Sequence, residues 1–199
     1  MTTRERILDE TLTLFAENGY DGTSVEQIAE KVGIKAPSLY NHFKGKEDIL
    51  NALIDMTEAR YEEFFGSDRH IGKLPESKEE FIQAAIQKVA FTMRDPLIRK
   101  MRKFLVREQF RNERFAEITT KHQLSGVQGM YKKIIEGMMS KGLFKAYDHE
   151  LLATEVTAPV ALWVAKADRQ PQCGQECMEN IERHIRHFCD VYMTELIRR

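Results

Sequence analysis

The sequence lacks long hydrophobic runs, and this limits the classes of protein that it can encode. Of its 199 residues, 42% are hydrophobic and 31% are charged. The longest apolar run, APVALWVA at residues 158–165, is much shorter than the roughly 20 residues that a membrane-spanning helix needs. The N-terminus, MTTRERILDE, is charged within its first few residues and shows no apolar h-region of a secretory signal. These features predict a soluble, cytoplasmic protein with no membrane partner.

Cysteine and the common catalytic motifs are also scarce or missing. The three cysteines, Cys173, Cys177 and Cys189, are odd in number and lie late in the chain, which is not the pattern of a disulfide framework. The sequence contains no P-loop, G-x-S-x-G, H-E-x-x-H or dinucleotide fingerprint. We therefore predict no enzyme, no cofactor and no metal site.

Apolar residues recur at helical spacing along the whole chain, and no strand alternation persists. The predicted helices cover residues 3–18, 23–32, 36–43, 46–65 and 77–93, a segment opened by Asp95-Pro96, and residues 119–141, 149–167 and 176–197. Thr2 with Glu5, and Thr23 with Glu26, have the spacing of a capping box. The pattern predicts an all-α fold of about nine helices.

Negative charge is missing from one segment. Residues 1–30 carry seven acids against two arginines, whereas the segment from Lys31 to Lys46 carries four lysines and no acid. This segment holds the turn at Gly33 between two short predicted helices, the arrangement of a helix-turn-helix, whose second helix enters the major groove of DNA. A carboxylate there would face phosphates, so its absence favours DNA binding. The net charge of -1 argues against a protein that coats nucleic acid without specificity.

Residues 22–50, GTSVEQIAEKVGIKAPSLYNHFKGKEDIL, resemble the DNA-binding domain of the TetR family of transcriptional regulators. The family pattern has a Thr or Ser where its second helix starts, then I-A-x-x-x-G, a small residue, L-Y-x-H-F and K-E. This chain carries every element: Thr23, Ile28-Ala29, Gly33, Ser38, Leu39-Tyr40, His42-Phe43 and Lys46-Glu47. It departs at Ala36-Pro37-Ser38, where many members have Ser-x-Gly, and this departure changes the base preference rather than the fold.

The resemblance implies a role for individual residues of this segment. The predicted DNA-binding residues are Ser24, Val25, Lys35, Ala36, Pro37, Ser38, Tyr40, Asn41, His42 and Lys46. Among them, Tyr40, His42 and Lys46 are expected at phosphates. Lys35 and the three residues after it are expected at bases or their flanking phosphates. Asn41 is expected at a base edge, and its amide suits adenine.

The resemblance also implies two domains with different functions. It predicts a helix-turn-helix DNA-binding domain at residues 1–46 and a helical effector-binding and dimerisation domain at residues 47–199. Ten apolar residues at helical spacing on the last two predicted helices would form a dimer bundle: Leu151, Leu152, Val156, Val160, Trp163, Ile181, Ile185, Phe188, Tyr192 and Leu196. Packing within one chain is the alternative, and we expect it for about half of them.

Eight large apolar side chains are candidates to line an effector cavity: Phe91, Met93, Phe104, Phe110, Met130, Tyr131, Met138 and Trp163. Ordinary core packing is the alternative for each of them. Methionine suits an adaptable pocket, and an apolar lining favours a hydrophobic effector, aromatic or lipid-like. The basic stretch at residues 99–114 is read first as a solvated helix face, with an anionic effector or a second nucleic-acid surface as the alternative.

Together these features predict a ligand-responsive transcriptional regulator. By family habit it is a repressor, which binds a palindromic operator as a homodimer and releases it on binding a small hydrophobic effector. Two alternatives stay open: a thiol or metal sensor with the same DNA-binding head, triggered at Cys173 and Cys177, and a protein-interaction module that has lost DNA binding. A small-molecule enzyme is a third rival.

Overall fold

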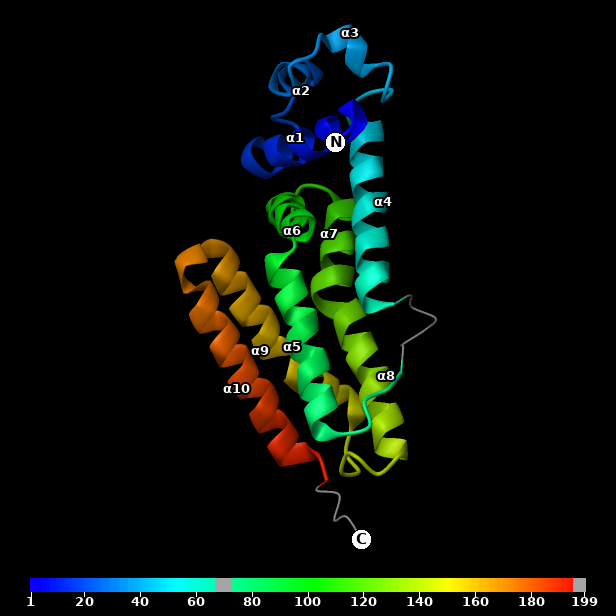
Figure 1. Ribbon diagram of the computed structural model, residues 1–199, viewed down its shortest axis with the longest axis vertical. Coiled ribbons are helices and arrows are strands. Elements are labelled where there is room, and N and C mark those ends of the chain that lie inside the picture. Colours follow the sequence, from blue (N-terminus) through cyan, green and yellow to red (C-terminus); the bar gives the residue numbers. More distant parts are fainter. Residues whose placement is uncertain (67–72, 195–199) are drawn as a thin grey trace. The chain divides into compact units, whose positions relative to one another are not determined.

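Helices make up nearly all the regular structure of the computed structural model, which describes residues 1–66 and 73–194 (Figure 1). The α-helices are α1 (Thr3–Asn18), α2 (Val25–Val32), α3 (Ala36–Leu39), α4 (Lys46–Phe65), α5 (Lys78–Arg94), α6 (Pro96–Glu108), α7 (Glu113–Thr120), α8 (Gly126–Ser140), α9 (His149–Arg169) and α10 (Gly174–Tyr192). A π-helical segment, Lys121–Ser125, joins α7 to α8, and a 3-10 turn, Pro171–Cys173, precedes α10.

The predicted all-α fold is confirmed. Over the described ranges the chain forms no β-strand, and a single isolated bridge pairs Phe144 with Met193. Because α7, the π segment and α8 follow one another without a break, counting them as one leaves nine helices in the part of the chain that is described. None of these helices has both the length and the hydropathy needed to cross a bilayer.

The chain divides into two compact units, each with its own apolar core. The first comprises Met1–Glu63 and Pro96–Thr119, and the second comprises Phe64–Asp95 and Thr120–Arg199. The first unit therefore contains α6 and α7 together with the three N-terminal helices and most of α4. The predicted boundary between residues 46 and 47 concerns function rather than compactness, and it stays a prediction.

The first unit is built around the apolar faces of its N-terminal helices. Helical spacing brings nine of their residues into the core: Ile7, Leu8, Leu12, Phe15, Ile28, Ala29, Val32, Leu39 and Phe43. Helix α6 adds Phe104, which is fully buried and stacks on Phe15 with 5.2 Å between ring centroids. This core fixes α3 on its supporting helices, which matters because α3 is too short to be stable alone.

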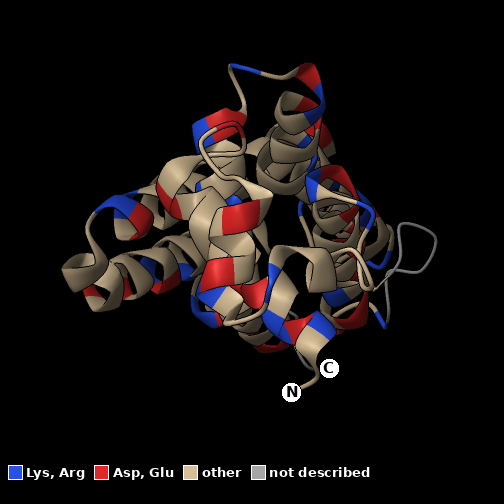
Figure 2. Cartoon of the chain, turned by 90° about the horizontal axis from the view of Figure 1, so that it is seen from above, with Lys and Arg blue, Asp and Glu red and all other residues tan. Residues whose placement is uncertain are grey.

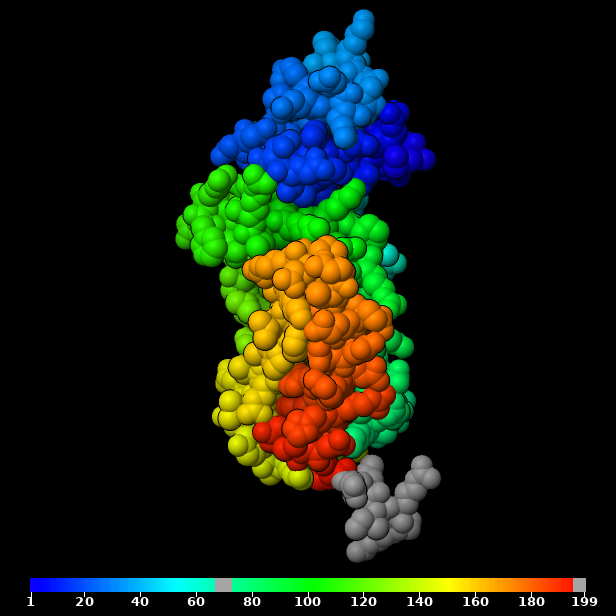
Figure 3. All heavy atoms as spheres, turned by 90° about the vertical axis from the view of Figure 1, so that its left-hand side faces the viewer, coloured from blue at the N-terminus to red at the C-terminus, as the bar shows by residue number. Residues whose placement is uncertain are grey.

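The second unit has α5, α8, α9 and α10 around its core. Helix α9 packs against α8 and α10, and α5 packs against α10; Figure 3 shows α9 and α10 side by side on one face of this unit. Five of the ten residues predicted for a dimer bundle are buried in this core: Leu152, Val156, Ile181, Ile185 and Phe188. Leu196 lies outside the described residues, so the remaining candidates for an interface are Leu151, Val160, Trp163 and Tyr192.

The start of α2 differs from the predicted capping box. The N-cap is Ser24, whose Oγ accepts a hydrogen bond from Gln27 N at 3.2 Å, while Ser24 N donates to Gln27 Oε1 at 2.8 Å. Thr23 is unavailable as a cap because its side chain is buried and its hydroxyl donates to Gly19 O at 2.9 Å. The predicted box of Thr2 and Glu5 at α1 is confirmed.

Two other helix boundaries differ between the prediction and the structure. The helix predicted to begin at residue 119 already begins at Glu113, as α7. The last helix ends at Tyr192, and its predicted continuation to Ile197 lies beyond residue 194, outside the described residues.

Two glycines end the helices on either side of the α1–α2 loop. Gly33 is left-handed, with φ 77° and ψ 35°, and Ile34 N then donates to Ala29 O at 2.9 Å. Gly19 has φ 82° and ψ 170°, a region that is almost exclusive to glycine. A Cβ at Gly19 would also lie 2.6 Å from Oε1 of Glu108, a side chain that is only 2% exposed.

Substitution of these glycines by alanine is expected to have unequal costs. Gly33→Ala should lower the free energy of unfolding by about 1 kcal/mol, because only the left-handed backbone is penalised and a Cβ there meets no atom within 4 Å. Gly19→Ala should cost about 2 kcal/mol or more, because backbone strain and the displaced carboxylate add. Urea denaturation of both variants measures the difference. Equal costs would show that displacement of the Glu108 carboxylate does not destabilise the Gly19→Ala variant.

Candidate nucleic-acid interface

The segment after Gly33 forms one turn of α-helix and then continues as tight turns. Lys35 is extended, with φ -77° and ψ 143°, and Pro37 lies in the first turn of α3, where its missing N–H is tolerated. Beyond Leu39 the backbone still curls, because His42 N and Phe43 N both donate to Leu39 O, at 2.9 and 3.1 Å. The curl turns Leu39 and Phe43 inward, where they are 0% and 3% exposed.

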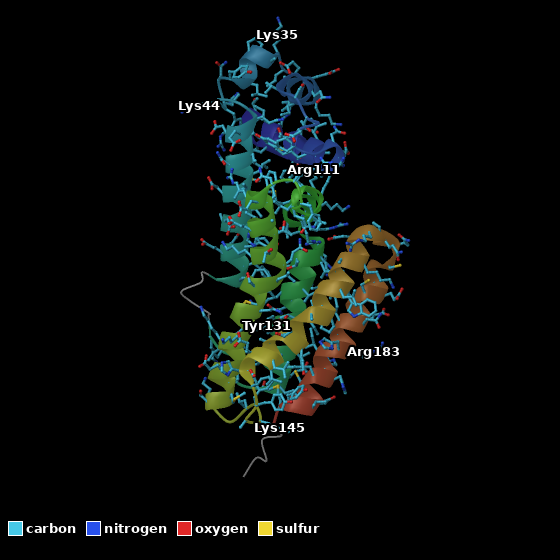
Figure 4. All side chains as sticks on the ribbon, turned by 180° about the vertical axis from the view of Figure 1, so that it is seen from behind. Lys35, Lys44, Arg111, Tyr131, Lys145 and Arg183 are labelled. Carbon is cyan, nitrogen blue, oxygen red and sulfur yellow. The ribbon has the colours of Figure 1, made fainter. Side chains whose placement is uncertain are left out.

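The curl leaves the intervening side chains exposed. Lys35, Pro37, Asn41 and His42 are exposed and Tyr40 is 55% exposed, whereas Ala36 and Ser38 are half-buried. The structure therefore brings most of the predicted DNA-binding residues onto one short, solvent-facing segment. Figure 4 shows Lys35 at the α3 end of the first unit, with its side chain directed away from the helices.

The positive charge near this segment includes two arginines of α1 as well as the lysines of the segment itself. Lys44 is exposed and is labelled near the same end in Figure 4. From α1, the guanidinium of Arg4 lies 4.8 Å from the ring centroid of Phe43, and Arg6 donates to Val32 O. Charges of both signs lie along the helices elsewhere (Figure 2), whereas Lys31 to Lys46 has no acid. The contacts of Arg4 and Arg6 are tertiary, so no sequence signal marks them.

Two of the predicted DNA-binding residues, Ser24 and Lys46, make hydrogen bonds that stabilise this unit. Ser24 caps α2, as described above. The ammonium of Lys46 donates to Tyr20 O at 2.7 Å and to Thr23 O at 2.9 Å, and it lies 4.3 Å from the ring centroid of Tyr20. Lys46 thus ties the α1–α2 loop to the start of α4. An ammonium has three donors, so the predicted phosphate contact of Lys46 stays a prediction.

The loop that Lys46 holds is further fixed through Tyr20. Its hydroxyl donates to Oε2 of Glu47 at 3.2 Å. Partial burial, with the Glu47 carboxylate adding, raises the pKa of Tyr20 to about 12. The phenol therefore stays protonated and remains a donor throughout the physiological range.

The predicted effector-binding residues divide between the two units. Phe104 belongs to the core of the first unit, and Phe110, also in the first unit, is 92% exposed. The other six belong to the second unit: Phe91, Met93, Met130, Tyr131, Met138 and Trp163. Of these, Tyr131 and Met138 are buried, and Figure 4 shows Tyr131 within that unit. The effector role of the set stays a prediction.

The cysteines lie in surroundings that weaken a thiol or metal sensor. Burial raises the pKa of Cys189 to about 12, and burial also raises the pKa of Cys177, so both thiols stay protonated and poorly reactive near neutral pH. Nε2 of His184 lies 3.3 Å from Val156 O. Nowhere in the described ranges do three potential ligands gather as a metal site would require.

A family model matches the N-terminal part of the chain. Residues 7–53 match the family described as bacterial regulatory proteins, tetR family. A curated relative, the biofilm operon icaADBC HTH-type negative transcriptional regulator IcaR of Staphylococcus aureus strain Newman, is 50% identical over 51 residues. That stretch is 26% of this chain and 27% of the relative, so the likeness covers about a quarter of either protein.

Solved structures extend the likeness of fold to nearly the whole chain. SmeT, the repressor of the Stenotrophomonas maltophilia multidrug efflux pump SmeDEF, has a TM-score of 0.69 at 18% identity, covering 98% of this chain and 93% of that one. A complex of SmeT with triclosan has a TM-score of 0.74 at 18% identity, covering 98% and 94%. At this identity the likeness concerns the fold alone.

Removal of the Lys46 ammonium is expected to destabilise the first unit. Lys46→Ala should lower the free energy of unfolding by about 1–2 kcal/mol, because two charge-assisted hydrogen bonds to backbone carbonyls are lost. Lys44→Ala is the matched control and should change stability by less than about 0.5 kcal/mol, since Lys44 is exposed. Thermal and urea unfolding measure both. Equal stability of the two variants would show that the bonds of Lys46 do not hold the loop.

Proposed function

We propose that this chain, whose residues 7–53 match the tetR family of bacterial regulatory proteins, is a ligand-responsive repressor. It binds a palindromic operator as a homodimer in the cytoplasm. A small hydrophobic effector that binds to the second unit releases it from that operator.

The exposed, acid-free segment around α3 carries this proposal. Its side chains supply what DNA contacts need, which is cations, hydroxyls and an amide. In this proposal the phosphate contacts come from Tyr40, His42, Lys44 and Lys46. Lys35 and Asn41 read base edges. The inward packing of Leu39 and Phe43 gives these groups a fixed geometry, which sequence-specific readout requires.

Dimerisation follows from how little DNA one such segment can read. A helix-turn-helix normally acts in pairs on half-sites about 34 Å apart, or a multiple of that distance. Helix α9 offers an apolar surface for the pairing, because Leu162 is 64% exposed and Leu151 is 44% exposed. Exposed leucines on one helix are typical of a contact surface.

The release step is supported by the composition of the second unit. Its buried residues in the described ranges include no ionised side chain; Thr157 is the buried polar residue, in a core otherwise of apolar and aromatic groups. The part of an effector that is lodged in this core would have to be apolar. The relative IcaR is named a negative regulator, and SmeT has been solved with triclosan, which agrees with repression and with a small ligand. The effector acts by binding one conformation more tightly than the other.

Two rival functions find no favouring observation. The thiol sensor is weakened because burial keeps Cys177, one of its two trigger cysteines, protonated. An interaction module without DNA binding would not require an acid-free segment.

Selection of duplexes from a random pool by the purified protein, at physiological salt, tests the proposal. We expect enrichment of a palindrome whose half-site centres lie about one helical turn apart or a multiple of it. Failure to enrich any sequence, with and without extracts of candidate effectors, would overturn DNA reading.

Substitutions in the α3 segment should separate base contacts from phosphate contacts. Lys35→Ala or Asn41→Ala should change which sequences are enriched, at a cost of about 1–3 kcal/mol per lost base contact. Lys44→Ala and Lys46→Ala should weaken all sequences alike, and each should reduce the slope of log affinity against log salt by about 0.9. Titrations at several salt concentrations measure these effects, and an equal loss at every sequence for Asn41→Ala would refute its base-reading role.

A charge on the exposed face of α9 should disrupt the dimer. Leu162→Glu is expected to raise the dimer dissociation constant at least about tenfold, because the carboxylate would have to be buried at the interface. Leu124→Glu is the matched control, since Leu124 is a 51% exposed leucine outside α9 and α10. Sedimentation velocity over a range of concentrations measures both. A dimer unaffected by Leu162→Glu would place the interface elsewhere.

A further inference from the structure

Three phenylalanines of the second unit form a compact aromatic cluster, Phe64, Phe65 and Phe91. Phe64 and Phe91 stack almost parallel, with 4.0 Å between ring centroids and an interplanar angle of 5°. Phe65 meets Phe91 edge-on, with 5.8 Å between centroids. Phe64 is 42% exposed, whereas Phe65 and Phe91 are half-buried, so the cluster is partly open to solvent.

A lysine with unusual surroundings adjoins this cluster. Nζ of Lys88 lies 4.9 Å from the ring centroid of Phe65, and the residue is half-buried. In the described part of the chain no carboxylate pairs with Lys88. Burial lowers its pKa below the ordinary value, which is the mark of a charge that has lost water without gaining a counterion.

Other cations of the second unit are differently placed. Lys78 pairs with Asp190, Lys132 with Glu150 at 3.2 Å, Lys166 with Glu176 at 2.9 Å, and Arg186 with Glu79 and Glu182. A half-buried ammonium that has only an aromatic ring as partner is destabilised, because a cation–π contact offsets only part of the lost hydration. An anion supplied from outside would restore the balance.

We propose that Lys88, Phe65 and Phe91 form the anion-binding end of the effector site, and that the effector is an amphipathic monoanion. It would carry one carboxylate, held by the ammonium of Lys88, on an aromatic or acyl body that packs on the phenylalanines. A single charge matches the one ammonium of Lys88, and the buried residues of the unit in the described ranges include no ionised group that could hold another. This inference rests on the proposed effector response and narrows its chemical class.

The pH dependence of binding follows from the same contact. The carboxylate is held while Lys88 is protonated, so affinity is full below the pKa of Lys88 and falls as the pH rises through it. Because burial already lowers that pKa, the fall should begin at a lower pH than for an ordinary exposed lysine.

The test is calorimetric titration of the full-length protein with matched pairs of probes: 2-naphthoate with 2-naphthamide, and decanoate with decanamide. Each pair differs in charge and hardly in shape. We expect at least one carboxylate to bind about tenfold or more tightly than its amide. Lys88→Met should abolish that preference, Lys88→Arg should keep it, and Lys166→Met should leave it unchanged as the control for a paired lysine.

Three outcomes would overturn the inference: no binding of either carboxylate, equal binding of carboxylate and amide, or a preference that survives Lys88→Met. Duplex selection without any probe reports separately on the proposed function. Normal DNA selection together with one of these three outcomes would refute only the anion site. A carboxylate preference without DNA selection would refute only the repressor.

Discussion

The structure depends on a constraint of length. Helix α3 has four residues, and an isolated helix so short is unstable, because nucleation costs more than one turn of hydrogen bonds returns. Its conformation must therefore come from outside it. Gly33 sets the direction of approach, Leu39 and Phe43 fix the inner face in the core, and Lys46 holds the preceding loop against α4. The rest of the first unit therefore holds α3 in a single geometry, which this segment could not keep alone.

Much of this arrangement is predictable from the sequence, because its signals are local. The apolar stripes, the stop at Gly33 and the charge sorting between residues 1–30 and 31–46 all lie within a few helical turns. The caps show the limit of local reasoning. Thr23 and Ser24 are both good N-cap residues, and the choice of Ser24 depends on the burial of Thr23 against Gly19, which is a tertiary fact.

The candidate sites show the same division. Leu39 and Phe43 lie four residues apart and both face the core, so Tyr40 and Asn41 between them are exposed. Their role as candidate DNA contacts could therefore be predicted. The bonds from Lys46 to Tyr20 and Thr23 join residues more than 20 positions apart, and no spacing rule indicates them. The exposure of Phe110 could not be predicted either, because composition does not distinguish it from a core phenylalanine. Nor could the sequence indicate that Lys88 has no carboxylate partner among the described residues.

The π-helical segment Lys121–Ser125 has a consequence for comparing this chain with others. Gly126 N donates to Lys121 O, five residues back rather than four, so this turn holds about one residue more than an α-helical turn. The hydrophobic repeat of α7 therefore does not continue in phase into α8. An alignment of this chain with a relative whose corresponding helix is purely α-helical needs a one-residue gap within residues 121–125. Without that gap, every buried position of α8, from Tyr131 to Met138, would be matched to the wrong face.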